Sequence, residues 1–180
     1  MRRFLLFIPL VICVVIGALF VKGLSLDPAD LPSAKIGKNF PAFSLPSIAD
    51  PDRSLTENDL KGGIRLVNIW ATWCPTCKQE HSFLNKLAQT EGVEIIGINY
   101  KDERNKAVQW LKRYKDPYLF NIYDEEGGLG LDLGVYGAPE TYIVDAQSVI
   151  HYRHVGEVNA RVWIELKAEM VKLGWSAKKS

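Results

Sequence analysis

The feature that most constrains the fold is a pair of cysteines placed directly after an apolar segment. Residues 64–70 (IRLVNIW) are mostly apolar, and WCPTC (73–77) follows within three residues. From Cys74 to Gln89, apolar residues recur at the spacing of one helix face. Pro75 suits the first helical turn, where its missing N–H costs nothing. The sequence therefore predicts a strand, a short loop and a helix that begins at Cys74.

This placement gives the two thiols different roles. Unpaired N–H groups and the positive end of the helix dipole favour a thiolate at Cys74, which we expect to be the more exposed and nucleophilic cysteine. Cys77 lies one turn further along the same face, within reach of a disulfide, and would be the resolving cysteine. A CxxC in this context is typical of a thioredoxin-like redox pair.

Two other interpretations of the pair remain open. Half of a zinc site would need two further ligands. The third cysteine, Cys13, lies in an apolar N-terminal run, and the three histidines (His81, His151 and His154) lack paired spacing. An inert structural disulfide is the other alternative, although so small a loop restrains the unfolded chain little.

The N-terminal segment has the pattern of a membrane anchor. Arg2 and Arg3 precede eighteen uncharged, mostly apolar residues, 4–21. At about 1.5 Å per residue these span about 27 Å, close to a bilayer core, and the arginines favour a cytoplasmic N-terminus. No small-residue cleavage site follows, so an uncleaved anchor over 1–22 is favoured over a cleaved signal peptide.

The rest of the chain is one domain after a linker. Residues 23–38 contain Pro, Ser and Gly without apolar periodicity, which is typical of a linker. A single domain is expected over 39–176, followed by a short tail, 177–180. The net charge of +1 and the absence of a basic block argue against nucleic-acid binding.

Apolar patterning predicts alternating strands and helices within that domain. We expect strands over 39–47, 65–71, 93–100, 120–124, 141–145 and 149–156, a turn over 54–60, and helices over 74–89, 103–114, 129–135 and 160–173, the last capped by Asn159. Early strand–helix–strand units imply parallel strands, and the late hairpin implies antiparallel ones. The fold class is therefore α/β, with a mixed central sheet flanked by helices.

Three stretches together resemble one known family. They are WATWCPTCKQEH (70–81), GINYKD (97–102) and GVYGAPETY (134–142). The chain resembles thioredoxin-like proteins and, more narrowly, the DsbE/CcmG family of cytochrome c biogenesis thiol:disulfide interchange proteins. The resemblance covers nearly the whole chain, including the anchor.

The resemblance implies further site residues. Pro139 matches a cis-proline that faces the redox pair and turns the backbone of Ala138 towards it, so that a substrate strand can pair there. Ala138, Thr141 and Tyr142 are expected to contact substrate. Trp73, Pro75 and Thr76 would support the cysteines, with Trp73 as an aromatic contact.

The family also implies an acidic site formed by Glu80 and Glu140. Carboxylates near Cys74 would raise its thiol pKa and make the protein more reducing, and one could shuttle the proton of Cys77. The alternative for Glu80 is an ordinary solvated helix residue, with Lys78 near enough to blunt its charge.

The function implied by the resemblance is that of a reductant in c-type cytochrome maturation, held in the bacterial inner membrane by one span with its catalytic domain in the periplasm. Its expected partners are apocytochrome c or a CcmH-type thiol protein, a DsbD/CcdA-type electron donor and the lipid bilayer, and no cofactor is required. A general anchored thioredoxin-like reductase is the main alternative. A copper chaperone or another metal-binding module is a second one.

Overall fold

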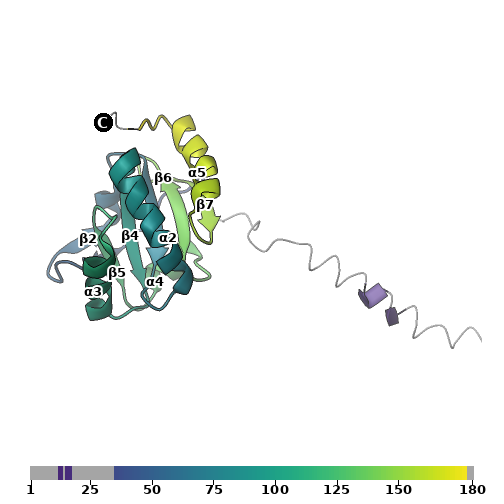
Figure 1. Cartoon of the computed structure of the whole chain (residues 1–180), viewed down its shortest axis with the longest axis horizontal. Coiled ribbons are helices and arrows are strands. Elements are labelled where there is room, and N and C mark those ends of the chain that lie inside the picture. The colour runs from purple at the N-terminus through teal and green to yellow at the C-terminus, as the bar shows by residue number, and fades with distance from the viewer. Residues whose placement is uncertain (1–11, 14, 18–34, 178–180) are drawn as a thin grey trace, which may run out of the picture. The chain divides into compact units, whose positions relative to one another are not determined.

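The computed structural model describes residues 12–13, 15–17 and 35–177 (Figure 1). The chain divides into two units, Met1–Pro32 and Ser33–Ser180. Most of the expected anchor and linker, and tail residues 178–180, lie outside the described residues, so these predictions stay predictions. Within the described ranges, no helix combines the length and the apolar character that crossing a bilayer requires.

The second unit is built on a five-stranded mixed sheet with the order β5-β4-β3-β6-β7. Its strands are β3 (Arg65–Trp70), β4 (Ile95–Tyr100), β5 (Asn121–Asp124), β6 (Glu140–Val144) and β7 (Ile150–Val155). β3, β4 and β5 are parallel, whereas β6 runs antiparallel to β3 and to β7. The predicted mixed sheet is confirmed, because the helical crossovers make parallel neighbours and the hairpin makes antiparallel ones.

The two faces of this sheet bury separate apolar cores. One core takes residues from α2 (Pro75–Lys86), α3 (Arg104–Tyr114) and α5 (Ala160–Lys172), together with Leu66 and Trp70 of β3. The other takes Val67 and Ile69 of the same strand and residues from α4 (Gly128–Leu133). Alternate residues of β3 thus face opposite cores, as the two-residue period of a strand requires. Figure 1 shows α2 and α5 beside the sheet.

The N-terminal part of the domain differs from the prediction. The strand expected over 39–47 shrinks to β1 (Ser44–Pro46), which pairs with β2 (Ser54–Thr56) in a separate two-stranded sheet. The prolines at 41 and 46 lack the N–H that a ladder needs, so the strand is short. The turn expected over 54–60 instead contains β2 and a 3-10 helix, η3 (Glu57–Leu60), held by a capping box between Thr56 and Asp59.

The cysteine-bearing helix also differs at both ends. It begins at Pro75 rather than at Cys74, which has an extended backbone and caps the helix. After Lys86 the helix continues as a π-helical turn, η4 (Leu87–Glu91). This turn ends at Gly92, which has the left-handed conformation. The start is the important difference, because it places the Cys74 sulfur where a capping side chain stands.

Gly97 of β4 packs closely against Trp70 and Asn121, and its replacement tests this packing. The indole N–H of Trp70 donates to Oδ1 of Asn121 (3.0 Å), and a methyl group on Gly97 would overlap both of these atoms. We expect Gly97→Ala to lower the free energy of unfolding by about 1–3 kcal/mol, as overpacking does. Gly128→Ala is the control, since no atom lies near its added methyl group. Urea unfolding measures both, and equal effects would contradict this packing.

Candidate active site

A disulfide joins Cys74 and Cys77 at the point where the loop after β3 enters α2. The backbone N–H of Cys77 donates to Sγ of Cys74 (3.0 Å), so Cys74 is the N-cap residue of the helix. The exposed Pro75 and the half-buried Thr76 form the first turn between the cysteines. A thiolate at Cys74 would receive this N–H bond and the positive end of the helix dipole. The hydrogen bond therefore distinguishes Cys74 from Cys77, and the roles of nucleophile and resolving cysteine stay predictions.

Exposure does not distinguish the two cysteines. Both are only 2% exposed in the disulfide form. The expectation that Cys74 is the more exposed one is wrong for this state. Asymmetry between the sulfurs comes instead from the capping hydrogen bond.

The loop before β6 lies directly against Cys74. The Ala138–Pro139 peptide bond is cis, as the resemblance implied, and the carbonyl oxygen of Ala138 is 3.3 Å from Sγ of Cys74. Thr141 and Tyr142 are fully buried within β6, between β3 and β7. Their side chains cannot contact a substrate in this state, so of the three expected substrate residues only Ala138 stays a candidate.

Glu80 is a buried carboxylate one turn after Cys77 on the same helix, 2% exposed. Oε1 accepts from the side-chain amide of Asn68 (3.0 Å), and Oε2 accepts from the backbone N–H of Val158 (2.8 Å). Burial raises the pKa of Glu80 to about 7, against the lowering effect of these hydrogen bonds. The solvated-helix alternative is wrong, since Lys78 is exposed at the surface and Glu80 is enclosed.

Asn68 connects Glu80 to a wider buried network that sequence analysis missed. The same amide nitrogen donates to Oγ1 of Thr141 (3.1 Å), and the Tyr118 hydroxyl donates to Oδ1 of Asn68 (2.8 Å). A polar residue in the middle of the apolar strand RLVNIW was the available signal. Burying Asn68 is favourable only because all of these partners satisfy it.

Glu140 lies on the other face of the sheet. It pairs with Ile69 of β3, whereas its neighbour Thr141 pairs with Asn68 and shares the Glu80 face. Arg153 forms a buried ion pair with the Glu140 carboxylate (2.9 Å). The structure therefore separates two carboxylates that the sequence analysis placed in one acidic site.

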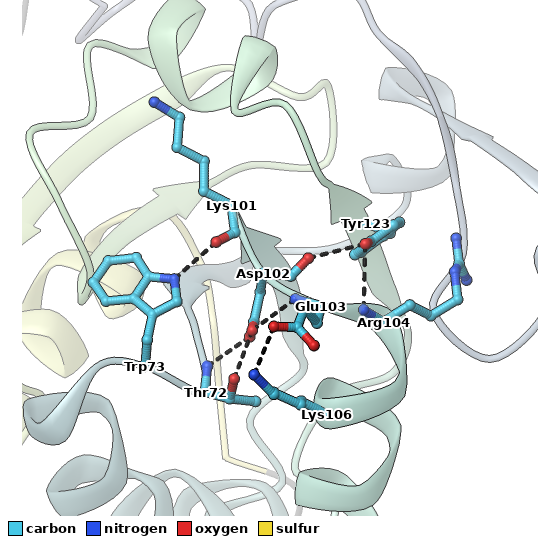
Figure 2. A network of polar contacts seen from close by, with 8 residues as sticks. All are labelled: Thr72, Trp73, Lys101, Asp102, Glu103, Arg104, Lys106 and Tyr123. Carbon is cyan, nitrogen blue, oxygen red and sulfur yellow. Dashed lines mark hydrogen bonds and ion pairs between the residues drawn. The ribbon is translucent and has the colours of Figure 1, made fainter.

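The loop before Cys74 is held by Asp102 at Thr72 and by the Lys101 carbonyl at Trp73, and sequence analysis missed Asp102 as a site residue (Figure 2). The Asp102 carboxylate accepts from the backbone N–H and the hydroxyl of Thr72, both at 2.6 Å. The indole N–H of Trp73 donates to the Lys101 carbonyl (2.9 Å), and the residue is 53% exposed. A large exposed aromatic ring thus stands fixed next to the disulfide.

The described part of the chain contains no group of three His, Cys, Asp or Glu side chains placed to hold a metal ion. His81 is buried, and one of its ring nitrogens lies 2.7 Å from the Lys115 carbonyl oxygen. Burial lowers the pKa of His81, which favours the neutral ring.

Known proteins are similar to this chain in sequence and in fold. The Redoxin family model matches residues 35–168. Thiol:disulfide interchange protein DsbE from Pseudomonas aeruginosa is 54% identical over 170 residues, 94% of each chain, and DsbE from Escherichia coli K12 is 47% identical over 171 residues, 92% of each chain. The chain belongs to the DsbE family of thiol:disulfide interchange proteins. Like these relatives, it is a thiol:disulfide oxidoreductase, and the Cys74–Cys77 disulfide is its candidate active site.

Solved structures agree on the fold. A secreted thiol-disulfide isomerase from Corynebacterium glutamicum has a TM-score of 0.61 at 21% identity, covering 74% of this chain and 84% of its own. A thio-disulfide isomerase from Thermus thermophilus has a TM-score of 0.59 at 21% identity, covering 75% of this chain and 96% of its own. The predicted thioredoxin-like α/β fold is confirmed.

The raised pKa of Glu80 predicts a pH dependence of stability. A carboxyl group whose folded pKa lies above its unfolded value, here about 7 against 4.5, stabilises the fold fully below pH 4.5 and loses that contribution as pH rises through 7. Between pH 4 and 8, we expect the unfolding free energy of wild type to fall by about 3 kcal/mol relative to that of Glu80→Gln, which has no carboxyl group to titrate at this position. Urea unfolding of the oxidised protein from pH 4 to 8 measures it. A difference that is constant with pH would contradict the raised pKa.

Proposed function

We propose that this oxidoreductase is the reductant of c-type cytochrome maturation, acting on the disulfide of an apocytochrome CxxCH motif or on that of a CcmH-type thiol protein. The three stretches that resemble the DsbE/CcmG family support this role. The observation that carries the reducing direction is the buried Glu80 beside Cys77. A carboxylate there opposes thiolate formation, so the reduced form is less stabilised than in strongly oxidising relatives.

The exchange begins with the Cys74 thiolate. It attacks one sulfur of the substrate disulfide, a mixed disulfide forms through Cys74, and the other substrate sulfur leaves as a thiolate. The fixed Trp73 ring and the Ala138 carbonyl are the groups next to Cys74 that would contact the substrate chain. An extended substrate could pair with the Ala138 backbone as an added strand.

The second step releases the substrate. Glu80 accepts the proton of the Cys77 thiol, and Cys77 attacks Sγ of Cys74. The Cys74–Cys77 disulfide forms again, and the second substrate thiolate leaves. Two electrons have then moved from the protein dithiol to the substrate. A carboxyl group with a pKa of about 7 suits this proton transfer near neutral pH.

We propose that the protein works from the periplasmic side of the bacterial inner membrane. The double arginine and the apolar run 4–21 support a single anchoring span over 1–22. The periplasm is oxidising, so the reduced pair must be regenerated by a membrane electron donor of the DsbD/CcdA type.

Trapping the mixed disulfide tests the proposed substrate. Without a resolving thiol the first covalent intermediate has no exit, so membranes containing Cys77→Ser should accumulate mixed disulfides through Cys74 with apocytochromes or the CcmH-type protein. Non-reducing gels and mass spectrometry identify the trapped proteins. Cys74→Ser is the matched control and should trap few.

Two outcomes would contradict this proposal. Trapping by Cys74→Ser alone would reverse the roles of the cysteines. A Cys77→Ser trap that holds only unrelated envelope proteins would favour the general-reductase alternative.

The anchor has a separate test. The full-length protein should stay with membranes after a carbonate wash, and its N-terminal peptide should be detected by mass spectrometry, because no cleavage site follows the apolar run. Recovery of a soluble protein that begins beyond Gly23 would overturn the anchor.

A further inference from the structure

We propose that Glu140 and Arg153 are positioning residues, a clamp that holds the 134–139 loop in place for a polypeptide substrate. In this account Glu140 does not act as a source of negative charge on the thiols. The inference deepens the proposed function and rests on it for one point, that the substrate is a polypeptide.

The clamp is a two-bond ion pair inside the protein. Nε of Arg153 donates to Oε2 of Glu140 (2.9 Å), and Nη2 donates to Oε1 (3.0 Å). The side chains are 0% exposed for Glu140 and 6% exposed for Arg153. A planar guanidinium that forms two parallel bonds with a carboxylate fixes geometry as well as charge.

Both members of the pair also hold the backbone of the loop. The backbone N–H of Tyr136 donates to Oε1 of Glu140 (2.9 Å), and Nη2 of Arg153 donates to the Gly134 carbonyl (2.9 Å). Gly137, Ala138 and Pro139 follow directly, and the Ala138 carbonyl is the group next to Cys74. The chain is therefore bonded on both sides of this carbonyl, at Gly134 and Tyr136 before it and through the Glu140 side chain at the start of β6 after it.

The clamp further fixes an exposed aromatic ring. The guanidinium carbon of Arg153 lies 4.8 Å from the ring centroid of Tyr136, a cation–π contact, while Tyr136 as a residue is 69% exposed. Tyr136 lies two residues before Ala138, and the exposed Trp73 directly precedes Cys74. Two exposed aromatic residues on the two loops that meet at Cys74 suit a polypeptide chain, because a small disulfide has no side chains to contact both.

The surroundings of Glu140 oppose an electrostatic role. Each carboxylate oxygen accepts two hydrogen bonds, Oε1 from Tyr136 and Arg153, and Oε2 from Tyr142 and Arg153. The arginine compensates the charge at contact distance, and the carboxylate lies on the opposite face of the sheet from Glu80. A compensated charge acts weakly on a more distant thiol.

Glu140→Gln separates the two accounts. It keeps the size of the side chain and an acceptor for the Tyr136 N–H, but it loses the charge and the paired bonds to Arg153. Reduced full-length protein in detergent is mixed with three oxidants, and the exchange rate constant is measured from pH 5 to 9. The oxidants are an oxidised CxxCH peptide, a CxxC peptide of equal length and charge without the histidine, and 2-hydroxyethyl disulfide.

The clamp predicts that the exchange rate falls selectively for the peptide oxidants. Glu140→Gln should lower the rate constants for both peptides at least about tenfold more than the rate constant for the small disulfide, as misplacement of a binding group does. The midpoint of the pH profile, which reports thiol ionisation, should stay where it is in wild type. Arg153→Lys should show the same loss of the peptide rate constants, because an ammonium keeps the charge but cannot form the two parallel bonds.

Arg65→Gln is the matched control. Arg65 bonds Glu94 (2.9 Å) and three backbone carbonyls, but it stands at the start of β3, at the other end of the strand from the disulfide. All three of its rate constants should match wild type. Arg153→Gln should repeat the loss of Glu140→Gln. If near-UV circular dichroism shows that this variant is unfolded, Glu140→Gln and Tyr136→Ala decide the question.

Two results would overturn the clamp. One is unchanged peptide rate constants in Glu140→Gln and Tyr136→Ala. The other is an equal change for all three oxidants with a shifted pH midpoint, which would make Glu140 an electrostatic residue. Equal wild-type rates for the two peptides would count against cytochrome specificity alone, because the clamp predicts the same loss for either peptide.

Discussion

The active site depends on one costly arrangement, a carboxyl group enclosed beside a disulfide. Glu80 is buried with two hydrogen-bond donors, from Asn68 and Val158, and its pKa rises to about 7 because solvent no longer stabilises the charge. Asn68 comes from β3, and Val158 from the segment between β7 and α5. The sheet and the segment that leads into the last helix must therefore both be in place before this carboxyl group has its partners.

Three other segments position Cys74. The helix α2 supplies the N–H of Cys77, the loop before β6 supplies the Ala138 carbonyl, and Asp102 accepts from the backbone N–H of Thr72, two residues before Cys74. The last two contacts join residues that the sheet topology brings together, whereas the first is local to the helix N-terminus. The separation between Glu80 and Glu140 follows from the same topology, because neighbouring positions on β6 face opposite cores. In our account Glu80 accepts a proton from Cys77, and Glu140 holds the 134–139 loop in place.

The sequence predicted this architecture well where local patterns determine it. Apolar runs located the five strands of the main sheet, and Pro75 marked the helix start within one residue. The cis bond at Pro139 and the importance of Glu80 came from the family resemblance rather than from local pattern. Asn68, Asp102 and Arg153 were missed, since each acts through a partner that is distant along the chain. Thr141 and Tyr142 were misjudged as substrate contacts, because burial within the sheet depends on the neighbours of β6, which local pattern does not specify.

The most direct test of the account is the titration of the Glu80 carboxyl group itself. Carbon-detected NMR of protein labelled with 13C at glutamate carboxyl groups, with Glu80→Gln for assignment, follows it in the oxidised and reduced forms. The account predicts a midpoint near pH 7 in the oxidised protein and a higher one when the cysteines are reduced, because an adjacent thiolate disfavours a second negative charge. A midpoint near 4.5 that does not change on reduction would show that Glu80 is an ordinary carboxylate and would remove it from the proton transfer at Cys77.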